Sequence, residues 1–259
     1  MAYVNEKENR AQQAVSHTEE MEKIYGNEIK ESVRDTTIYD VDFVCMGDSG
    51  SDKEWRKITL EPLDSVSAII KAAEDGSRMA VLNFSSYRNP GGGFIGGSRA
   101  QEECLCHESF LYNVLSQKRE FYDWNNQHKN RSLYCNRGMY TPGVIFMRGD
   151  KQVSCDVITC AAPNFSAASK NQVSPKENSK ALKDRIRFIL DIARENRVNT
   201  LILGAYGCGV FGQDPREVAD IFKEYLETEY KCFEKVIFAI PKGKDGNCQA
   251  FAEVWDFDV

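Results

Sequence analysis

The sequence predicts an α/β protein with a largely parallel or mixed sheet that carries helices on both faces. Five short apolar runs are nearly continuous rather than alternating, which is typical of strands covered on both faces. Helical patterns separate the last three runs, so strand, helix, strand, helix and strand follow one another. The predicted strands span residues 79–84, 143–147, 156–162, 200–205 and 235–240.

The helices are predicted from apolar positions at helical spacing. Residues 1–35 are polar and predict one or two helices that pack through a narrow apolar stripe. That stripe consists of Ala11, Val15, Met21 and Ile24. Further helices are predicted over residues 62–75, from near Ala100, over 179–196 and over 214–229. The run Asp214-Pro215-Arg216-Glu217 is a strong helix start, with Asp as N-cap, Pro at N1 and Glu at N3.

Length and composition favour one globular domain. The chain has 259 residues, 42% of them apolar and 28% charged, which is enough for a sizeable core. We therefore expect a single domain over residues 1–259, with 1–40 as a helical extension. Residues 47–52 (GDSGSD) predict a loop, and the polar stretches 117–142 and 163–178 predict long surface segments.

Hydrophobicity and net charge disfavour several classes of protein. No apolar run approaches the roughly 18 residues of a membrane span, and the polar N-terminus has no secretory h-region. We expect a cytoplasmic protein with no membrane contact. Thirty-three Lys and Arg against 39 Asp and Glu give a net charge of −6, which argues against general nucleic-acid binding. This net charge is still compatible with a small anionic ligand bound by backbone amides.

The nine cysteines are expected to be reduced thiols rather than a disulfide framework. The run Cys104-Leu105-Cys106-His107 has two thiols and an imidazole close together. No second ligand pair accompanies it at zinc-site spacing. We therefore expect no metal and no cofactor.

Two glycine clusters stand out because each follows a predicted strand and precedes a helix. Glycine loop 1 covers residues 89–98 (NPGGGFIGGS), and glycine loop 2 covers residues 204–212 (GAYGCGVFG). Such loops expose consecutive backbone N–H groups beside a helix N-terminus, which binds phosphate without basic side chains. Ligands of such sheets sit at the carboxyl ends of the strands, where both loops belong. The plainer alternative is that both are connecting turns.

Glycine loop 2 also matches the dinucleotide fingerprint through Gly207, Gly209 and Gly212. That fingerprint requires an acidic residue at the end of the next strand, about 20 residues on. Here the next strand ends at Pro241, which is too late. A hydride-transferring enzyme is disfavoured, whereas a pyrophosphate ligand remains attractive.

Adjacent carboxylates follow glycine loop 1 in the run Gln101-Glu102-Glu103. Beside an anion site such a pair is electrostatically unfavourable, and a raised carboxyl pKa suits a general acid. Alone, the pair is also explained as the first turn of a helix, where the dipole favours glutamate.

Taken together, Gly91-Gly92-Gly93, seven further residues and then Gln101-Glu102-Glu103 resemble the GGG-x6–8-QEE signature of the poly(ADP-ribose) glycohydrolases. Residues 81–84, 156–164 and 204–215 and the helix from Arg10 are similar to segments of the bacterial-type members. The resemblance implies a three-layer α/β/α macrodomain with a mixed central sheet. It also implies binding of ADP-ribose and hydrolysis of the ribose–ribose O-glycosidic bond in poly(ADP-ribose), from chain ends.

The resemblance also implies roles for particular residues. Glu103 matches the catalytic acid/base, and Glu102 matches the carboxylate that binds ribose hydroxyls. Asn89 matches the asparagine that orients the distal ribose, and Phe211 is expected to press on that ribose. The other expected substrate contacts are Gly92, Gly93, Gln101, Tyr206, Gly207, Cys208, Gly209, Val210 and Gly212.

Two departures from the signature's usual surroundings concern substrate size and partner: the residues 104–110 and the insert near 121–137. The implied partners are poly(ADP-ribose), ADP-ribose and ADP-ribosylated proteins, and the chain is expected to be a monomer. The sequence leaves two alternatives open. One is a mono(ADP-ribosyl) hydrolase acting on protein or nucleic acid, and the other is a non-enzymatic ADP-ribose reader.

Overall fold

The computed structural model describes residues 2–46, 56–73 and 76–258. Within them a mixed sheet of seven strands has the order β1-β4-β5-β3-β6-β7-β2. The pairs β1–β4 and β4–β5 are antiparallel, and the other pairs are parallel. This confirms the predicted α/β class. The strands are β1 (Thr37–Tyr39), β2 (Lys57–Glu61), β3 (Met79–Phe84), β4 (Gly138–Arg148), β5 (Lys151–Cys160), β6 (Thr200–Leu203) and β7 (Lys235–Ala239).

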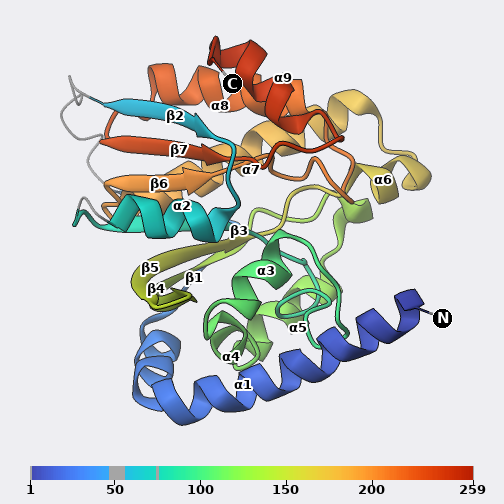
Figure 1. Ribbon diagram of the computed structural model, residues 1–259. Helices are drawn as coiled ribbons and strands as arrows, with labels where there is room; N and C mark the ends of the chain where they lie inside the picture. The colour runs from blue at the N-terminus through green and yellow to red at the C-terminus, as the bar shows by residue number, and fades with distance from the viewer. Residues whose placement is uncertain (1, 47–55, 74–75, 259) are drawn as a thin grey trace.

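Helices cover both faces of this sheet (Figure 1). One face carries α7 (Pro175–Glu195), α8 (Pro215–Thr228) and α9 (Asn247–Trp255). The other carries α1 (Ala2–Asp35), α2 (Ser65–Ala72), α3 (Gln101–His107), α4 (Leu111–Leu115) and α5 (Arg119–Gln127). Three further short helical segments are η2 (Asn130–Ser132), α6 (Phe165–Ala168) and η3 (Ser169–Asn171).

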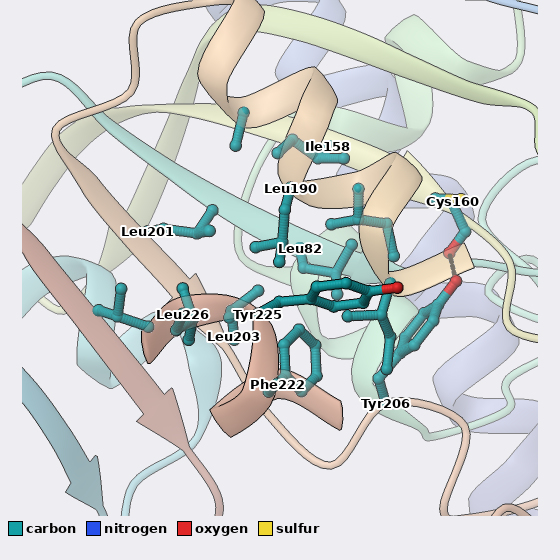
Figure 2. Close-up of a cluster of buried hydrophobic side chains, with 14 of the residues drawn as sticks. Leu82, Ile158, Cys160, Leu190, Leu201, Leu203, Tyr206, Phe222, Tyr225 and Leu226 are labelled. Carbon is teal, nitrogen blue, oxygen red and sulfur yellow. Dashed lines mark hydrogen bonds between the residues drawn. The ribbon is translucent and has the colours of Figure 1, made fainter. Parts of the chain in front are cut away.

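The central strand β3 shows why its sequence is continuously apolar. Ala80 and Leu82 belong to the core beneath α7 and α8, whereas Met79 and Val81 belong to the core beneath α1 and α2. Alternate side chains of a strand point to opposite faces, so both sets are buried only when both faces are covered. Figure 2 shows the first of these cores, in which Leu82 packs near Phe222 of α8. The prediction that the strands are covered on both faces is confirmed for β3, β5, β6 and β7. Over residues 143–147 of β4, the buried side chains Val144 and Phe146 belong to one core only.

Helix starts follow their capping signals. The Asp214 carboxylate accepts hydrogen bonds from the N–H groups of Arg216 (2.8 Å) and Glu217 (3.2 Å), as the sequence predicts. The helix predicted from residue 62 begins later, at Ser65. Its start is set by Asp64, whose carboxylate caps the first turn.

The N-terminal segment forms α1, which has a kink at Tyr25. The predicted apolar stripe is partly wrong, because Val15 and Ile24 are 46% and 57% exposed. The buried stripe is instead Ala14, Met21, Tyr25 and Ile29. These residues share one helical face, whereas Val15 and Ile24 lie to its sides. None of the described helices is both long and apolar enough to cross a membrane.

The prediction of a surface segment over residues 117–142 is wrong in part. It contains α5, whose Phe121 and Tyr122 are buried, and β4 begins within it at Gly138. Two successive apolar residues in a polar helix are too few to produce a clear helical period. Residues 163–178 contain α6, η3 and the start of α7, while the loop predicted at 47–52 lies outside the described residues.

Helix α1 contacts glycine loop 1 directly. The Arg10 guanidinium donates from Nε to the Gly97 carbonyl (3.0 Å). Gly97 has φ +71°, and a Cβ atom there would lie 2.2 Å from the Lys7 carbonyl oxygen. Only glycine therefore allows the loop and the helix backbone to approach so closely.

We expect Gly97→Ala to lower the melting temperature more than Gly149→Ala. Both glycines have positive φ, so each alanine costs about 1–2 kcal/mol in the left-handed region. A Cβ at Gly149 meets no atom within 4 Å, whereas at Gly97 it collides with α1. Thermal unfolding of both variants measures the difference, and equal losses would contradict tight packing of α1 on the loop.

Candidate active site

The two glycine loops lie at the same edge of the sheet. Glycine loop 1 follows β3 and leads to α3, and glycine loop 2 follows β6 and leads to α8. Because β3 and β6 are neighbouring parallel strands, their carboxyl ends place the two loops side by side. The structure thus brings together the two regions that the sequence singled out.

The Glu103 carboxylate is fixed by backbone donors on both of its oxygens. The N–H of Gly93 donates to Oε1 (2.8 Å), and the N–H of Ala100 donates to Oε2 (2.9 Å). The second bond closes the first turn of α3, as in a capping box. Glu103 is 7% exposed, so its position is set by the glycine loop and the helix start together.

The neighbouring Glu102 has different surroundings. Its Oε2 accepts from the Ser86 N–H (2.7 Å), and its Oε1 accepts from the Asn83 side-chain amide (3.2 Å). Burial raises the pKa of Glu102 to about 8, although these hydrogen bonds oppose the rise. The negative charge of Glu103 acts in the same direction as burial. At neutral pH Glu102 is therefore mostly a neutral acid, able to donate a hydrogen bond.

Gly92 is the residue that lets both carboxylates approach the loop. Its φ is +61°, and a Cβ atom there would lie 2.7 Å from Glu103 Oε1 and 2.9 Å from Glu102 Oε2. A side chain at this position would therefore displace one or both carboxylates. Asn89 lies exposed on the same loop, and its carbonyl accepts from the Gly92 N–H (3.1 Å).

Glycine loop 2 offers free backbone donors. Its turns are closed by four hydrogen bonds: Tyr206 N–H to Gly204 carbonyl, Cys208 N–H to Ala205 carbonyl, Gly212 N–H to Gly209 carbonyl and Gln213 N–H to Gly207 carbonyl. Four other N–H groups carry no hydrogen bond to any described part of the chain: those of Gly207, Gly209, Val210 and Phe211. Val210 is 83% exposed, so this loop faces solvent. Such a row of unpaired amides beside the start of α8 is suited to an anion.

A row of three aromatic side chains connects the two loops. Phe211 is half-buried and meets the Tyr134 ring edge-on, with 6.1 Å between the ring centroids. Tyr134 in turn stacks on Tyr87, just before glycine loop 1, at 4.1 Å. Sequence reasoning missed Tyr87 and Tyr134. Tyr134 lies in a polar stretch and has φ +62°, so no period marks it.

Comparison with known proteins identifies the family. The microbial-type PARG catalytic domain matches residues 4–149, which include glycine loop 1 and both glutamates. The chain belongs to this family. No curated protein matches its sequence.

Solved PARG structures extend the similarity to the remaining residues. Poly(ADP-ribose) glycohydrolase from Thermomonospora curvata has a TM-score of 0.87 at 28% identity, covering 96% of this chain and 100% of that one. The same enzyme bound to the inhibitor ADP-HPD gives 0.84 at 29% identity, covering 95% and 99%. The Deinococcus radiodurans enzyme in complex with ADP-ribose gives 0.80 at 31% identity, covering 88% and 97%.

Two residues predicted to bind substrate have other tasks in this PARG family member. The Tyr206 side chain is fully buried and donates to the Cys160 carbonyl (3.0 Å), as Figure 2 shows. Gln101 accepts from the Phe84 N–H and donates to the Leu82 carbonyl, both at 2.9 Å. The structure therefore makes Tyr206 a support beneath glycine loop 2 and Gln101 a brace between α3 and β3.

The cysteines near the site are poor nucleophiles. Cys208 lies on glycine loop 2, and burial raises the pKa of its thiol to about 12. Burial also raises the pKa of Cys104 and Cys106 on α3. In the described part of the chain no three His, Cys, Asp or Glu side chains converge where they could hold a metal ion.

We expect the free energy of unfolding to fall as pH rises from about 5 to 8, and Glu102→Gln to flatten that slope. Between the ordinary pKa of 4.5 and the folded value of about 8, the folded chain holds one proton more than the unfolded chain. Stability is therefore fully present at the acidic end and is lost as pH rises. Each tenfold change in proton affinity is worth about 1.4 kcal/mol, so the effect should reach several kcal/mol.

Urea unfolding at several pH values measures this slope. Glu177→Gln is the control, because hydrogen bonds to Ser174 and Arg131 lower the pKa of Glu177 to about 2. That carboxylate is ionised in both states throughout the window. An unchanged slope in Glu102→Gln would show that Glu102 is not the buried acid.

Proposed function

We propose that the chain hydrolyses the ribose–ribose O-glycosidic bond of poly(ADP-ribose) and releases ADP-ribose. The observation that carries the proposal is the Glu103 carboxylate, fixed by Gly93 and Ala100, at the same edge of the sheet as the free amides of glycine loop 2. A fixed carboxylate beside an anion site is what a substrate with a diphosphate next to its scissile bond requires. The T. curvata and D. radiodurans relatives, solved with ADP-HPD and ADP-ribose, support it.

The substrate is oriented by groups on both loops. The diphosphate binds the free N–H groups of glycine loop 2, those of Gly207, Gly209, Val210 and Phe211. The distal ribose then lies toward glycine loop 1. Glu102, as a neutral acid, and Asn89 hold ribose hydroxyls, and Phe211 presses on the ring. This macrodomain-type placement fixes the reacting carbon, and fixed positioning alone can lower a barrier by several kcal/mol.

Glu103 performs both proton transfers. It donates its proton to the leaving ribose oxygen as the distal ribose approaches an oxocarbenium ion. The N–H groups of Gly93 and Ala100 stabilise the carboxylate that forms. This carboxylate then takes a proton from the attacking water, which restores the acid.

Release from chain ends is favoured by α1. Arg10 and the Lys7 backbone lie against Gly97, at the end of glycine loop 1. The helix therefore bounds the site on the side of the catalytic carboxylates. ADP-ribosylated proteins are the corresponding macromolecular partners.

We expect Glu103→Gln to lower hydrolysis of purified poly(ADP-ribose) by at least 10²- to 10⁴-fold, because the amide cannot donate or take the proton. ADP-ribose binding should survive. Glu177→Gln is the matched control: Glu177 is also the third residue of its helix and accepts a capping hydrogen bond, from Ser174 (2.9 Å).

Products are resolved by length. ADP-ribose as the sole product supports cleavage from ends. No cleavage by the wild type, with intact ADP-ribose binding, would favour a mono(ADP-ribosyl) hydrolase or a reader. Near-normal turnover by Glu103→Gln would remove this residue from the chemistry.

Phe211→Ala should lower turnover far more than ADP-ribose affinity. The substitution keeps the backbone N–H groups that bind the diphosphate but removes the ring that holds the distal ribose. That contact matters most as the sugar flattens in the transition state. Phe43→Ala is the control, because Phe43 is also partly buried against the same core but packs on Tyr39 and Phe188.

Turnover, affinity and melting temperature are measured on both variants. Parallel losses of all three in Phe211→Ala would mean that the ring only packs beneath the loop, where truncation costs roughly 3–5 kcal/mol.

A further inference from the structure

Helix α7 carries a buried cation that the proposed chemistry does not use. Arg185 is 1% exposed and is the largest fully buried side chain among the described residues. An arginine side chain stays protonated in proteins, so this position holds a full positive charge inside the fold. Burying a charge without an opposite partner is strongly unfavourable unless something else depends on it.

The guanidinium is hydrogen-bonded but has no counter-ion in the part of the chain that the structure describes. It donates to the carbonyls of Ala161 and Leu133 and to the side-chain oxygen of Asn136, the last at 2.8 Å. All three partners are neutral, and no carboxylate of the described residues forms an ion pair with Arg185. The other buried arginine differs: Arg137, 6% exposed, faces Asp40 at 3.3 Å.

This unpaired charge lies beneath glycine loop 2. Ala161 follows β5 directly, and the next residue, Ala162, packs against Gly207, where a Cβ atom would come within 2.8 Å of it. Arg185 also acts on Tyr206 in the same loop: burial raises the pKa of that phenol, and the arginine charge opposes the rise. The cation and the free amides therefore belong to one structural unit.

The two segments that form and underlie the loop supply no other cation. Residues 152–169 and 198–215, which form the end of β5 and the whole of glycine loop 2, contain no Lys or Arg. Lys242 and Lys244 follow β7 at the same edge of the sheet, but both are exposed to solvent, where salt screens their charges. Within the two segments themselves, a diphosphate would otherwise rely on amide dipoles alone.

We propose that Arg185 is an electrostatic positioning residue, whose unpaired charge favours a diphosphate on glycine loop 2. The inference rests on the proposed function, because it takes the ligand to be ADP-ribose. Arg185 touches no substrate and acts through the loop above it. The absence of a carboxylate partner is then a requirement, since a counter-ion would cancel the attraction.

The sharpest test supplies the missing counter-ion and removes no side chain. Asn136→Asp keeps the oxygen that accepts from Arg185 and pairs the cation with a carboxylate. We expect ADP-ribose affinity to fall at least tenfold, because a unit charge still acts over about 10 Å at an effective dielectric constant of about 20 and the diphosphate carries two negative charges. Asn199→Asp is the control, because it adds the same charge at the opposite end of β6, which begins at Thr200.

Calorimetric titration with ADP-ribose is compared with competition by adenosine, which lacks the diphosphate. We expect Asn136→Asp and Arg185→Gln to lower the affinity for ADP-ribose but not the affinity for adenosine. At pH 6, Arg185→Lys should bind ADP-ribose more tightly than Arg185→Gln. Unchanged ADP-ribose affinity in Asn136→Asp, or an equal loss of affinity for adenosine, would overturn the inference. Wild-type binding of ADP-ribose is measured first and tests the proposed function separately.

Discussion

The hydrogen bonds from Gly93 and Ala100 to the Glu103 carboxylate hold the site together. They connect a loop that follows the central strand β3 to the first turn of α3, so the carboxylate is placed by backbone rather than by a flexible side chain. Gly92 allows this arrangement because any Cβ there would collide with both glutamates. Helix α1 then supports the loop from outside, through Arg10 and Gly97. Packing of α1 on one face of the sheet thus helps to hold the Glu103 carboxylate in place at the sheet edge.

Charge is distributed unequally around the two loops. The carboxyl groups gather at glycine loop 1, and burial keeps Glu102 mostly neutral at neutral pH. Glycine loop 2 has unpaired amides, and Arg185 lies beneath it without a counter-ion among the described residues. In the proposed function, the anion therefore binds glycine loop 2 while Glu103 acts as the acid beside glycine loop 1. This separation reconciles a net charge of −6 with an anionic substrate.

The sequence predicts the elements that depend on local signals. Continuous apolar runs marked β3 to β7, Asp214 marked the start of α8, and the glycine clusters marked both loops. The short edge strands β1 and β2 have no such run and were not predicted. What could not be predicted depends on tertiary contacts. Tyr206 follows the end of a strand, where no period fixes which way a side chain points, and it turns into the core. Tyr134 meets Phe211 only because the chain folds back between them.

A crystal structure with ADP-ribose tests most directly whether one ligand reaches both loops at once. We expect the diphosphate on the amides of glycine loop 2 and the C1″ atom of the distal ribose about 3.5 Å from the Glu103 carboxylate. A complex in which the diphosphate occupies that loop while the distal ribose points away from Glu103 would contradict this expectation.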